Sequence, residues 1–179
     1  VGTDGQILGA QAVGADGVDR RIDVIATAMR AGLKATDLID LDLAYAPPYG
    51  QAKDPVNQTG MVAHNVLTGE LVLTGPNELA EDMPVLDVRT PGEYAAGHMP
   101  NSLNIPHTQL RDRLDEVRAW AETNVGDQPF VVMCAAGVRS WIGYRIVRHA
   151  GFNVTMLSGG IQTLRAWLGD RADSVLVKE

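Results

Sequence analysis

The chain contains a single cysteine, Cys134, which opens the run CAAGVRS between an apolar stretch and a helical pattern. The stretch Phe130–Met133 is short, apolar and valine-rich, as expected for a strand buried on both faces of a parallel sheet. Apolar residues recur at helical spacing from Val138 to Ala150, and Gly151 follows where a C-terminal cap belongs. We therefore expect the thiol to lie in a turn between a strand and a helix N-terminus.

The residues that follow the cysteine favour a reactive thiolate. A helix N-terminus offers unpaired backbone N–H groups and a positive dipole end, and both lower the pKa of a nearby thiol. Ala135, Ala136 and Gly137 have little or no side chain, so the backbone can curl around the sulfur. Arg139 adds a fixed positive charge and several donors at the rim. The pattern predicts a nucleophile, and the alternative for a lone cysteine is a buried structural thiol.

The run CAAGVRS resembles the active-site loop of single-domain rhodaneses, which reads Cys-x-x-Gly-x-Arg-Ser. Two further stretches are similar to that family in the same order, VLDVRTPGEYAAGHMPNSLNIP at 85–106 and LSGGIQTLRAW at 157–167. Together they cover roughly residues 70 to 168. The resemblance implies an α/β rhodanese domain, with helices on both faces of a parallel sheet, and a substrate-binding loop formed by Ala135, Ala136, Gly137 and Val138.

Loop length distinguishes two activities within this fold. The related cell-cycle dual-specificity phosphatases have a longer loop, sized for a phosphate, whereas four residues separate Cys134 from Arg139 here. The resemblance thus implies sulfur transfer, in which Cys134 carries sulfane sulfur as a persulfide that loop amides bind. Because Ala135 and Ala136 offer no basic side chain, only Arg139 and the helix dipole attract anions, and we expect a persulfide or polysulfide donor in preference to thiosulfate.

Residues upstream of the loop have supporting or structural roles. The resemblance implies that Asp87 and Arg89 lie beside the loop and support it, and an ordinary surface ion pair is the alternative. Thr90–Glu93 has the spacing of a capping box with proline at the first helical position, and needs no catalytic role. His98 and His107 are expected to be structural. With four histidines, one cysteine and no metal-ligand spacing, we predict no metal site.

The first third of the chain predicts local elements but little chemistry. Gln6–Val13 has strand character, and an amphipathic stripe from Val18 to Met29 predicts a helix. Asp54-Pro55 signals the start of a second helix that runs to Gly69. Between them, the prolines and glycine of Ala44–Asn57 indicate an ordered loop.

The stretches ILGAQAVG, GVDRRIDVIATAM and LDLAYAPPYGQAKDPVN resemble the C-terminal dimerisation domain of flavin-dependent pyridine nucleotide-disulfide oxidoreductases. They are most similar to the coenzyme A-disulfide reductase branch, in which members can carry a C-terminal rhodanese domain. In full-length relatives the Ala-Tyr-Ala-Pro-Pro stretch approaches the partner subunit's active site, and a tyrosine there acts on the thiol substrate. The resemblance carries this role to Tyr45, with Tyr49 as a second candidate. Met61 stands where relatives often place an aromatic residue.

These resemblances divide the chain into a partial α+β dimerisation domain at 1–69 and a rhodanese-like domain at 70–179, whose first strand is expected at Leu71–Leu73. The sequence has no Gly-x-Gly-x-x-Gly after a strand and no phosphate-binding P-loop, and 179 residues leave no room for FAD and nicotinamide domains. The chain therefore looks like the C-terminal piece of a longer enzyme. On its own we expect it to bind no cofactor, whereas FAD and NAD(P)H, with coenzyme A as a further candidate, belong to a full-length relative.

Composition excludes several classes of function. The chain is 45% hydrophobic and 21% charged, which is ordinary for globular proteins, and its net charge of −7 without a basic patch argues against nucleic-acid binding. One cysteine allows no intrachain disulfide, and no apolar run predicts a signal peptide or a membrane span, so we expect a cytoplasmic protein. The expected partners are a small-molecule persulfide, polysulfide or thiosulfate, a second copy in a homodimer, and the missing flavin and nicotinamide domains.

Two functions of different class remain. The first is a sulfurtransferase domain that uses Cys134 and is natively coupled to a flavoprotein that reduces disulfides, persulfides or polysulfides. The second is a non-catalytic rhodanese-like module that binds a partner or senses sulfur, next to a dimerisation segment. The chain keeps Cys134, Gly137 and Arg139 together, which favours the enzyme.

Overall fold

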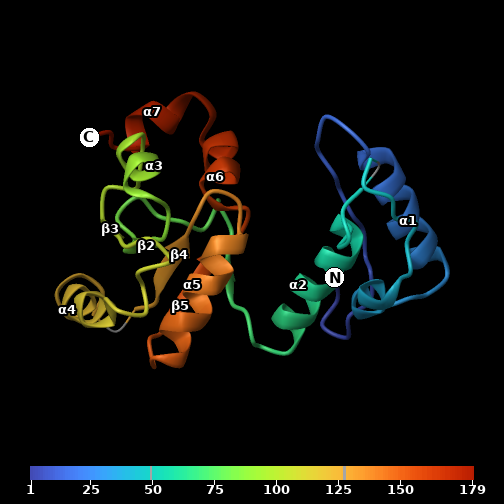
Figure 1. The fold of residues 1–179 in the computed structure, drawn as a ribbon, viewed down its shortest axis with the longest axis horizontal. Helices are drawn as coiled ribbons and strands as arrows, with labels where there is room; N and C mark the ends of the chain where they lie inside the picture. The colour runs from blue at the N-terminus through green and yellow to red at the C-terminus, as the bar shows by residue number, and fades with distance from the viewer. Residues whose placement is uncertain (49, 127) are drawn as a thin grey trace. The chain divides into compact units, whose positions relative to one another are not determined.

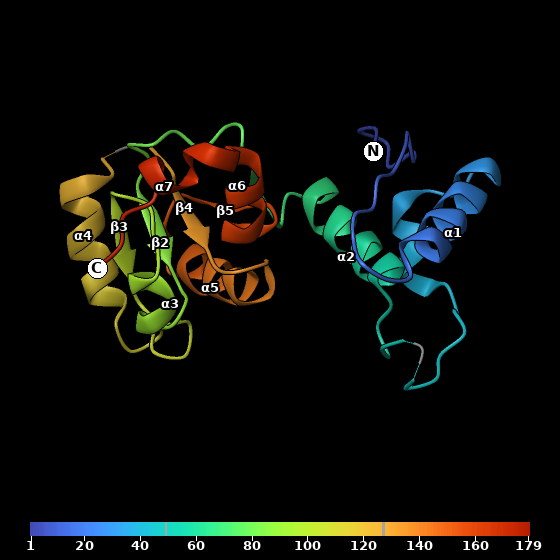
Figure 2. The same cartoon turned by 90° about the horizontal axis from the view of Figure 1, so that it is seen from above.

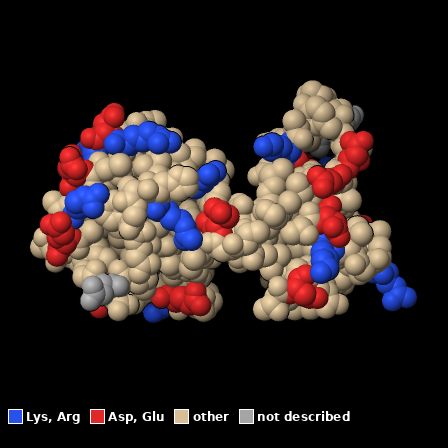
Figure 3. Space-filling view, turned by 90° about the horizontal axis from the view of Figure 1, so that it is seen from below, with Lys and Arg blue, Asp and Glu red and all other residues tan. Residues whose placement is uncertain are grey.

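The computed structural model describes residues 1–48, 50–126 and 128–179 (Figure 1). Within them the chain forms two compact units, Val1–Leu71 and Val72–Glu179. Each unit has its own cluster of buried apolar side chains. No helix in the described ranges combines the length and the apolar character that crossing a membrane requires. On the face of each unit that Figure 3 presents, acidic and basic side chains are interspersed.

The first unit is built from three helical elements, α1 (Val18–Arg30), the 3-10 helix η1 (Ala35–Asp40) and α2 (Pro55–Leu67). The start of α2 follows its sequence signal, because the Asp54 carboxylate accepts the Val56 N–H at 2.9 Å and Pro55 occupies the first turn. Gly60 of α2 packs against η1, where a Cβ would lie 2.9 Å from the Ile39 nitrogen and 3.0 Å from the Ala35 oxygen. The close approach of these two helices therefore depends on a glycine.

The strand expected over Gln6–Val13 is not formed. Gln6 makes an isolated antiparallel bridge with Lys34, and residues 7–13 have no regular structure. A strand needs a neighbouring backbone to satisfy its N–H and C=O groups, and Lys34 provides only one such position. The apolar pattern of this segment instead places Ile7 in the core of the unit, which consists of buried side chains from Ile7, Ala28, Ala35, Leu38 and Val56.

The second unit contains the parallel sheet that the family resemblance implies, and this sheet has five strands in the order β1-β5-β4-β2-β3. The strands are β1 (Leu73–Thr74), β2 (Val85–Asp87), β3 (Ser102–Asn104), β4 (Phe130–Met133) and β5 (Val154–Leu157). The helical elements are α3 (Pro91–Ala95), α4 (Leu114–Asn124), α5 (Val138–His149), α6 (Gly160–Leu168), η2 (Gly169–Arg171) and α7 (Ala172–Val175). The first strand begins later than predicted, because the Leu71 N–H donates to Asn65 after the end of α2.

Helices cover both faces of the sheet, and α5 and α6 lie on opposite sides of it (Figure 2). Side chains of β4 alternate between these faces, as the pleat of a strand requires. Val131 and Met133 share a buried cluster with residues of α6 and α7, whereas Val132 lies 3.4 Å from the position that a Cβ on Gly143 of α5 would take. Because β4 is central and ends at Met133, the next residue emerges at the carboxyl edge of the sheet, where ligands bind in open α/β folds.

Candidate active site

Cys134 lies in the turn between β4 and α5, as the sequence predicts. It is only 1% exposed. The Gly137 N–H donates to Sγ at 3.2 Å, and the thiol donates to the Ser140 hydroxyl at 3.4 Å. That hydroxyl donates in turn to the Gly137 carbonyl at 2.8 Å. The sulfur is therefore held by the loop 134–139, called the Cys134 loop below, and by the first turn of α5.

These contacts lower the pKa of the Cys134 thiol. Burial acts in the opposite direction, because removing water from a thiolate raises its pKa. Once the thiol is ionised, the Ser140 hydroxyl can turn to donate to the thiolate, and this bond together with those from the backbone N–H groups of Gly137, Ser140 and Ala136 outweighs burial. The donors are the loop amides and the helix N-terminus that the sequence analysis assigns to this turn, and their effect is a larger thiolate fraction near neutral pH.

The Cys134 loop is held on its other side by the N-terminus of α6. The Ile161 N–H donates to the Cys134 carbonyl at 2.9 Å, and the Gln162 N–H donates to the Ala135 carbonyl at 3.1 Å. Gly160 has a φ of 61°, and a Cβ there would lie 2.5 Å from the first of these carbonyl oxygens. Because the loop carbonyls point toward α6, the loop N–H groups are free to point toward the sulfur.

The guanidinium of Arg139 is paired with Glu93 through two hydrogen bonds of 2.7 Å. The hydrogen bonds from Arg139 are the main reason that the pKa of Glu93 falls to about 2. The predicted capping box is confirmed, since Glu93 also accepts the Thr90 N–H at 3.1 Å. Its pairing with Arg139 was missed by the sequence analysis. The positive charge expected to attract anions is thus largely neutralised.

Asp87 and Arg89 form a buried ion pair, so the alternative of a surface pair is wrong. Asp87 is 0% and Arg89 is 4% exposed, and Arg89 Nε lies 3.0 Å from both carboxylate oxygens. The same guanidinium donates to the backbone oxygens of Glu93 and Gly97 at 2.9 Å each. The pair therefore fixes the segment around α3 from which Glu93 reaches Arg139.

The remaining loop residues leave an uncharged rim. Ala136 is exposed, Ala135 is half-buried and Val138 is 73% exposed. Gly137 has a φ of 133°, a backbone conformation that favours glycine. The rim of the Cys134 loop therefore offers small apolar groups and backbone amides to a substrate.

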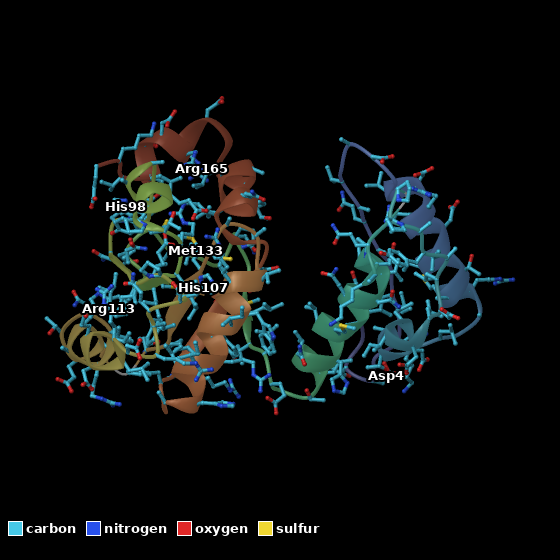
Figure 4. The ribbon with its side chains drawn as sticks, in the orientation of Figure 1. Asp4, His98, His107, Arg113, Met133 and Arg165 are labelled. Atoms are coloured by element: carbon cyan, nitrogen blue, oxygen red, sulfur yellow. The ribbon has the colours of Figure 1, made fainter. Side chains whose placement is uncertain are left out.

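His98 and His107 occupy separate places in the second unit (Figure 4). His98 Nδ1 lies 3.0 Å from the Tyr94 carbonyl, and its ring stacks on Tyr94 with centroids 3.8 Å apart. The His107 N–H donates to the Val88 carbonyl at 3.1 Å. Within 1–48, 50–126 and 128–179, no group of three or more His, Cys, Asp or Glu residues is arranged to hold a metal ion.

The tyrosine candidates belong to the first unit. Tyr45 is 56% exposed and lines a pocket of about 420 Å³ together with Arg20, Arg21 and Asp54. Arg21 and Asp54 form a salt bridge of 3.0 Å across this pocket. Tyr49 lies outside the described residues.

Comparison with known proteins defines the class of this chain. Residues 75–166 match the rhodanese-like domain, and residues 1–55 match the dimerisation domain of pyridine nucleotide-disulphide oxidoreductases. The chain belongs to the rhodanese-like family, and it joins a rhodanese-like domain to a dimerisation segment of those oxidoreductases.

Individual relatives match stretches of this chain that differ in length. Coenzyme A disulfide reductase of Staphylococcus aureus (strain bovine RF122 / ET3-1) is 50% identical over 58 residues, which are 32% of this chain and 13% of that protein. The crystal structure of reduced Bacillus anthracis CoADR-RHD is 39% identical and has a TM-score of 0.78. The matched region is 87% of this chain and 28% of the CoADR-RHD chain. The structure of an NAD-dependent persulfide reductase from A. fulgidus is 42% identical and has a TM-score of 0.72. The matched region is 83% of this chain and 26% of the reductase chain. The chain thus spans about a quarter of these two solved structures.

The paired glycines at the start of α6 are a sequence signal that could have extended the predicted site. Gly159 and Gly160 follow β5 after one residue, Ser158, and adjacent glycines near a strand end often allow close backbone approach. Nothing local could have indicated Glu93, because 46 positions separate it from Arg139.

Proposed function

We propose that the second unit is a sulfurtransferase domain that carries sulfane sulfur as a persulfide on Cys134. The observation that carries this proposal is the environment of Sγ, which lies at a helix N-terminus 3.2 Å from the Gly137 N–H and has a lowered pKa. A thiolate is the nucleophilic form of cysteine, and the same amides can bind the charge of a persulfide anion. The membership of the rhodanese-like family and the A. fulgidus persulfide reductase among its relatives support a role in persulfide chemistry.

The proposed reaction has two displacement steps. The Cys134 thiolate attacks the outer sulfur of a donor persulfide, a new S–S bond forms, the donor's S–S bond breaks, and the donor leaves as a thiolate. An acceptor thiolate then attacks the outer sulfur of the Cys134 persulfide and releases the Cys134 thiolate. No external oxidant or reductant is consumed, because each step exchanges one thiolate for another.

The charge of the loop supports a persulfide or polysulfide donor over thiosulfate. Thiosulfate carries two negative charges, so its binding gains from a cationic group that is not already neutralised. Ala135 and Ala136 contribute none, and Glu93 pairs with the guanidinium of Arg139 at 2.7 Å. A persulfide with one charge at the sulfur needs only the loop amides.

We also propose that the first unit forms a homodimer contact and that the second unit exchanges sulfur with a reductase that uses FAD and NAD(P)H in the cytoplasm. The dimerisation match at 1–55 and the coenzyme A disulfide reductase relatives support this arrangement. Tyr45, exposed beside its pocket, is the proposed contact for a thiol substrate there.

Intact-mass measurement tests the covalent intermediate. The wild type and Cys134→Ser are incubated separately with a low-molecular-weight persulfide and with thiosulfate. We expect the wild type to gain the mass of one sulfur atom from the persulfide, faster than from thiosulfate, and the variant to gain none. Faster loading by thiosulfate would contradict the donor preference, and an equal gain in the variant would place the sulfur elsewhere.

The second candidate is the non-catalytic module, and the burial of Cys134 at 1% exposure favours it, since an acceptor must reach the sulfur. The mass experiment separates the two functions. A folded wild type that gains no sulfur from any donor would support the binding or sensing module.

A further inference from the structure

The helix that carries Glu93 is held in place by little apolar packing. This helix, α3, spans only Pro91–Ala95, and none of its side chains is fully buried. A helix of five residues makes too few hydrogen bonds to form by itself in water, so contacts from elsewhere in the fold must position it. The pair between Glu93 and Arg139 therefore depends on the contacts that fix α3.

The capping box fixes the start of α3, and a segment far away in the sequence contacts its end. We call this segment, residues 177–179, the strap. The Glu179 N–H donates to the Ala95 carbonyl at 3.1 Å, and Val177 and His98 form an antiparallel bridge with hydrogen bonds of 2.9 and 3.0 Å. The last carbonyls of a helix have no partner within it, and the strap supplies an N–H group to one of those in α3.

The strap is anchored in the core of the second unit. Val175 and Leu176 precede it, are buried, and belong to the same apolar cluster as Met133 of β4 and Ile161 of α6. These are the elements that hold the Cys134 loop. The strap itself lies at the surface, where Val177 is 43% exposed. It therefore leads from a fixed point in the core to the end of α3.

His98 joins the strap to the part of α3 next to Glu93. Its backbone pairs with Val177, while its ring stacks on Tyr94 with centroids 3.8 Å apart and Nδ1 lies 3.0 Å from the Tyr94 carbonyl. Tyr94 directly follows Glu93 in the chain. A continuous set of contacts thus runs from the strap through His98 and Tyr94 to the carboxylate that pairs with Arg139.

We propose that the strap is a positioning element that holds Glu93 against Arg139 and thereby sets the charge that a donor meets at the Cys134 loop. With the strap in place, two hydrogen bonds of 2.7 Å neutralise the guanidinium. When the strap is released, the end of α3 frays, Glu93 loses its fixed position, and the charge of Arg139 becomes available to anions. The positioning half of this inference rests on these contacts alone, whereas its effect on donor choice rests on the proposed sulfurtransferase function.

Alkylation of the full chain by iodoacetate and by iodoacetamide reports this charge, because Cys134 is the only cysteine and the two reagents differ by one negative charge. Val177→Pro removes the N–H that bonds His98. The backbone accepts proline there, because Leu176 before it is already extended, with φ −87° and ψ 127°. We expect the ratio of the iodoacetate rate to the iodoacetamide rate to rise roughly two- to fivefold, the effect of losing one partly exposed ion pair.

Lys178→Pro is the matched control, because it places proline one position further along, where the N–H makes no hydrogen bond among the described residues. It also removes the exposed pair of Lys178 with Asp173, which contributes little, so the ratio should stay at the wild-type value. Glu93→Gln tests the route. This variant should raise the ratio by itself, and Val177→Pro should add nothing to it, because Arg139 is already free.

Three outcomes would overturn the inference. They are an unchanged ratio in folded Val177→Pro, an equal rise in Lys178→Pro, and a further rise when Val177→Pro is combined with Glu93→Gln. Urea unfolding shows whether each variant is folded. If Val177→Pro does not fold, Glu179→Pro takes its place, because it removes the N–H that bonds Ala95 and should raise the ratio in the same way.

Sulfur-transfer kinetics test the effect on donor choice. The ratio of kcat/KM for thiosulfate to kcat/KM for a persulfide should rise in Val177→Pro by about the same factor as the alkylation ratio, and it should not change in Lys178→Pro. A raised alkylation ratio with an unchanged donor ratio would contradict the effect on donor choice. Absence of transfer by the wild type would contradict the proposed function, while the alkylation ratios would still decide the positioning half.

Discussion

Replacing Gly160 by alanine should raise the pKa of the Cys134 thiol by pushing the loop away from α6. A Cβ at this position would lie 2.5 Å from the Cys134 oxygen, 2.6 Å from the Ala135 oxygen and 2.7 Å from the Ala135 carbonyl carbon. These are backbone atoms, which cannot rotate away as the end of a flexible side chain can. The loop must therefore retreat by roughly 0.5–1 Å to restore ordinary contact distances, and the 2.9 Å bond from Ile161 to Cys134 is stretched.

The size of the effect follows from the hydrogen bonds to sulfur. Retreat of the loop turns its amides, and loss of the 3.2 Å contact from Gly137 N–H to Sγ removes one hydrogen bond to a charged group. Such a bond contributes roughly 1.5–3 kcal/mol. Because one pKa unit corresponds to about 1.4 kcal/mol, we expect the thiol pKa to rise by about 1–2 units in Gly160→Ala.

Gly169→Ala is the matched control. Gly169 has a φ of 56°, close to the 61° of Gly160, but a Cβ there would meet nothing within 4 Å. Both variants place alanine at a positive φ that L-residues rarely adopt, and the ψ of −129° at Gly169 adds to the strain there, so both should lose stability, measured by urea unfolding. Only Gly160→Ala should shift the pH dependence of alkylation, which reports Cys134 alone because the chain has one cysteine. An unshifted profile in folded Gly160→Ala, or an equal shift in Gly169→Ala, would refute the reasoning.

Three further predictions concern the charges around the loop. Glu93→Gln keeps an acceptor for the helix cap but frees the charge of Arg139. The ratio of kcat/KM for thiosulfate to kcat/KM for a persulfide should therefore rise roughly two- to fivefold. A fall in this ratio would contradict the charge argument. Glu93 has a lowered pKa of about 2. Its pair with Arg139 therefore contributes fully to stability above the pKa of about 4.3 that a glutamate has in the unfolded chain, and this contribution is lost only as pH falls toward 2. From pH 5 to 8 the rate of loop persulfidation should therefore rise through a single ionisation, that of the thiol, and a second inflection would refute this. Asp87→Asn leaves Arg89 buried without its charge partner and should lower the free energy of unfolding by roughly 3–5 kcal/mol. Asp173→Asn, in the exposed pair with Lys178, should leave it nearly unchanged, and an equal loss in the two variants would contradict the argument.

Local signals predicted the parts of the site that depend on neighbouring residues. The strand Phe130–Met133 and the helical spacing from Val138 place Cys134 in a turn, and the structure has that turn with α5 beginning at Val138. The structure also contains the predicted capping box at Thr90 and the predicted helix that begins after Asp54. Each of these features is set by hydrogen bonds or apolar periodicity within a few residues, which a single sequence displays.

Features set by distant residues could not be predicted in the same way. The partner of Arg139 depends on how α3 is placed over the sheet, and the approach of Gly160 to Cys134 depends on β4 and β5 being neighbours. The Gln6–Val13 error has the same origin, because a segment with strand character forms a strand only if another strand is available to pair with it.

Two helix N-termini meet at the Cys134 loop, with α5 beside the sulfur and α6 behind the carbonyls. Because the loop is fixed from both sides, it need not rearrange when its charge moves from one sulfur atom to the next. In the proposed cycle the empty thiolate and the loaded persulfide are both anions, and both face the same set of amides. The loop therefore gives little preference to either state, and the concentrations of donor and acceptor determine the direction of sulfur flow. A carrier of this kind works equally well in both directions.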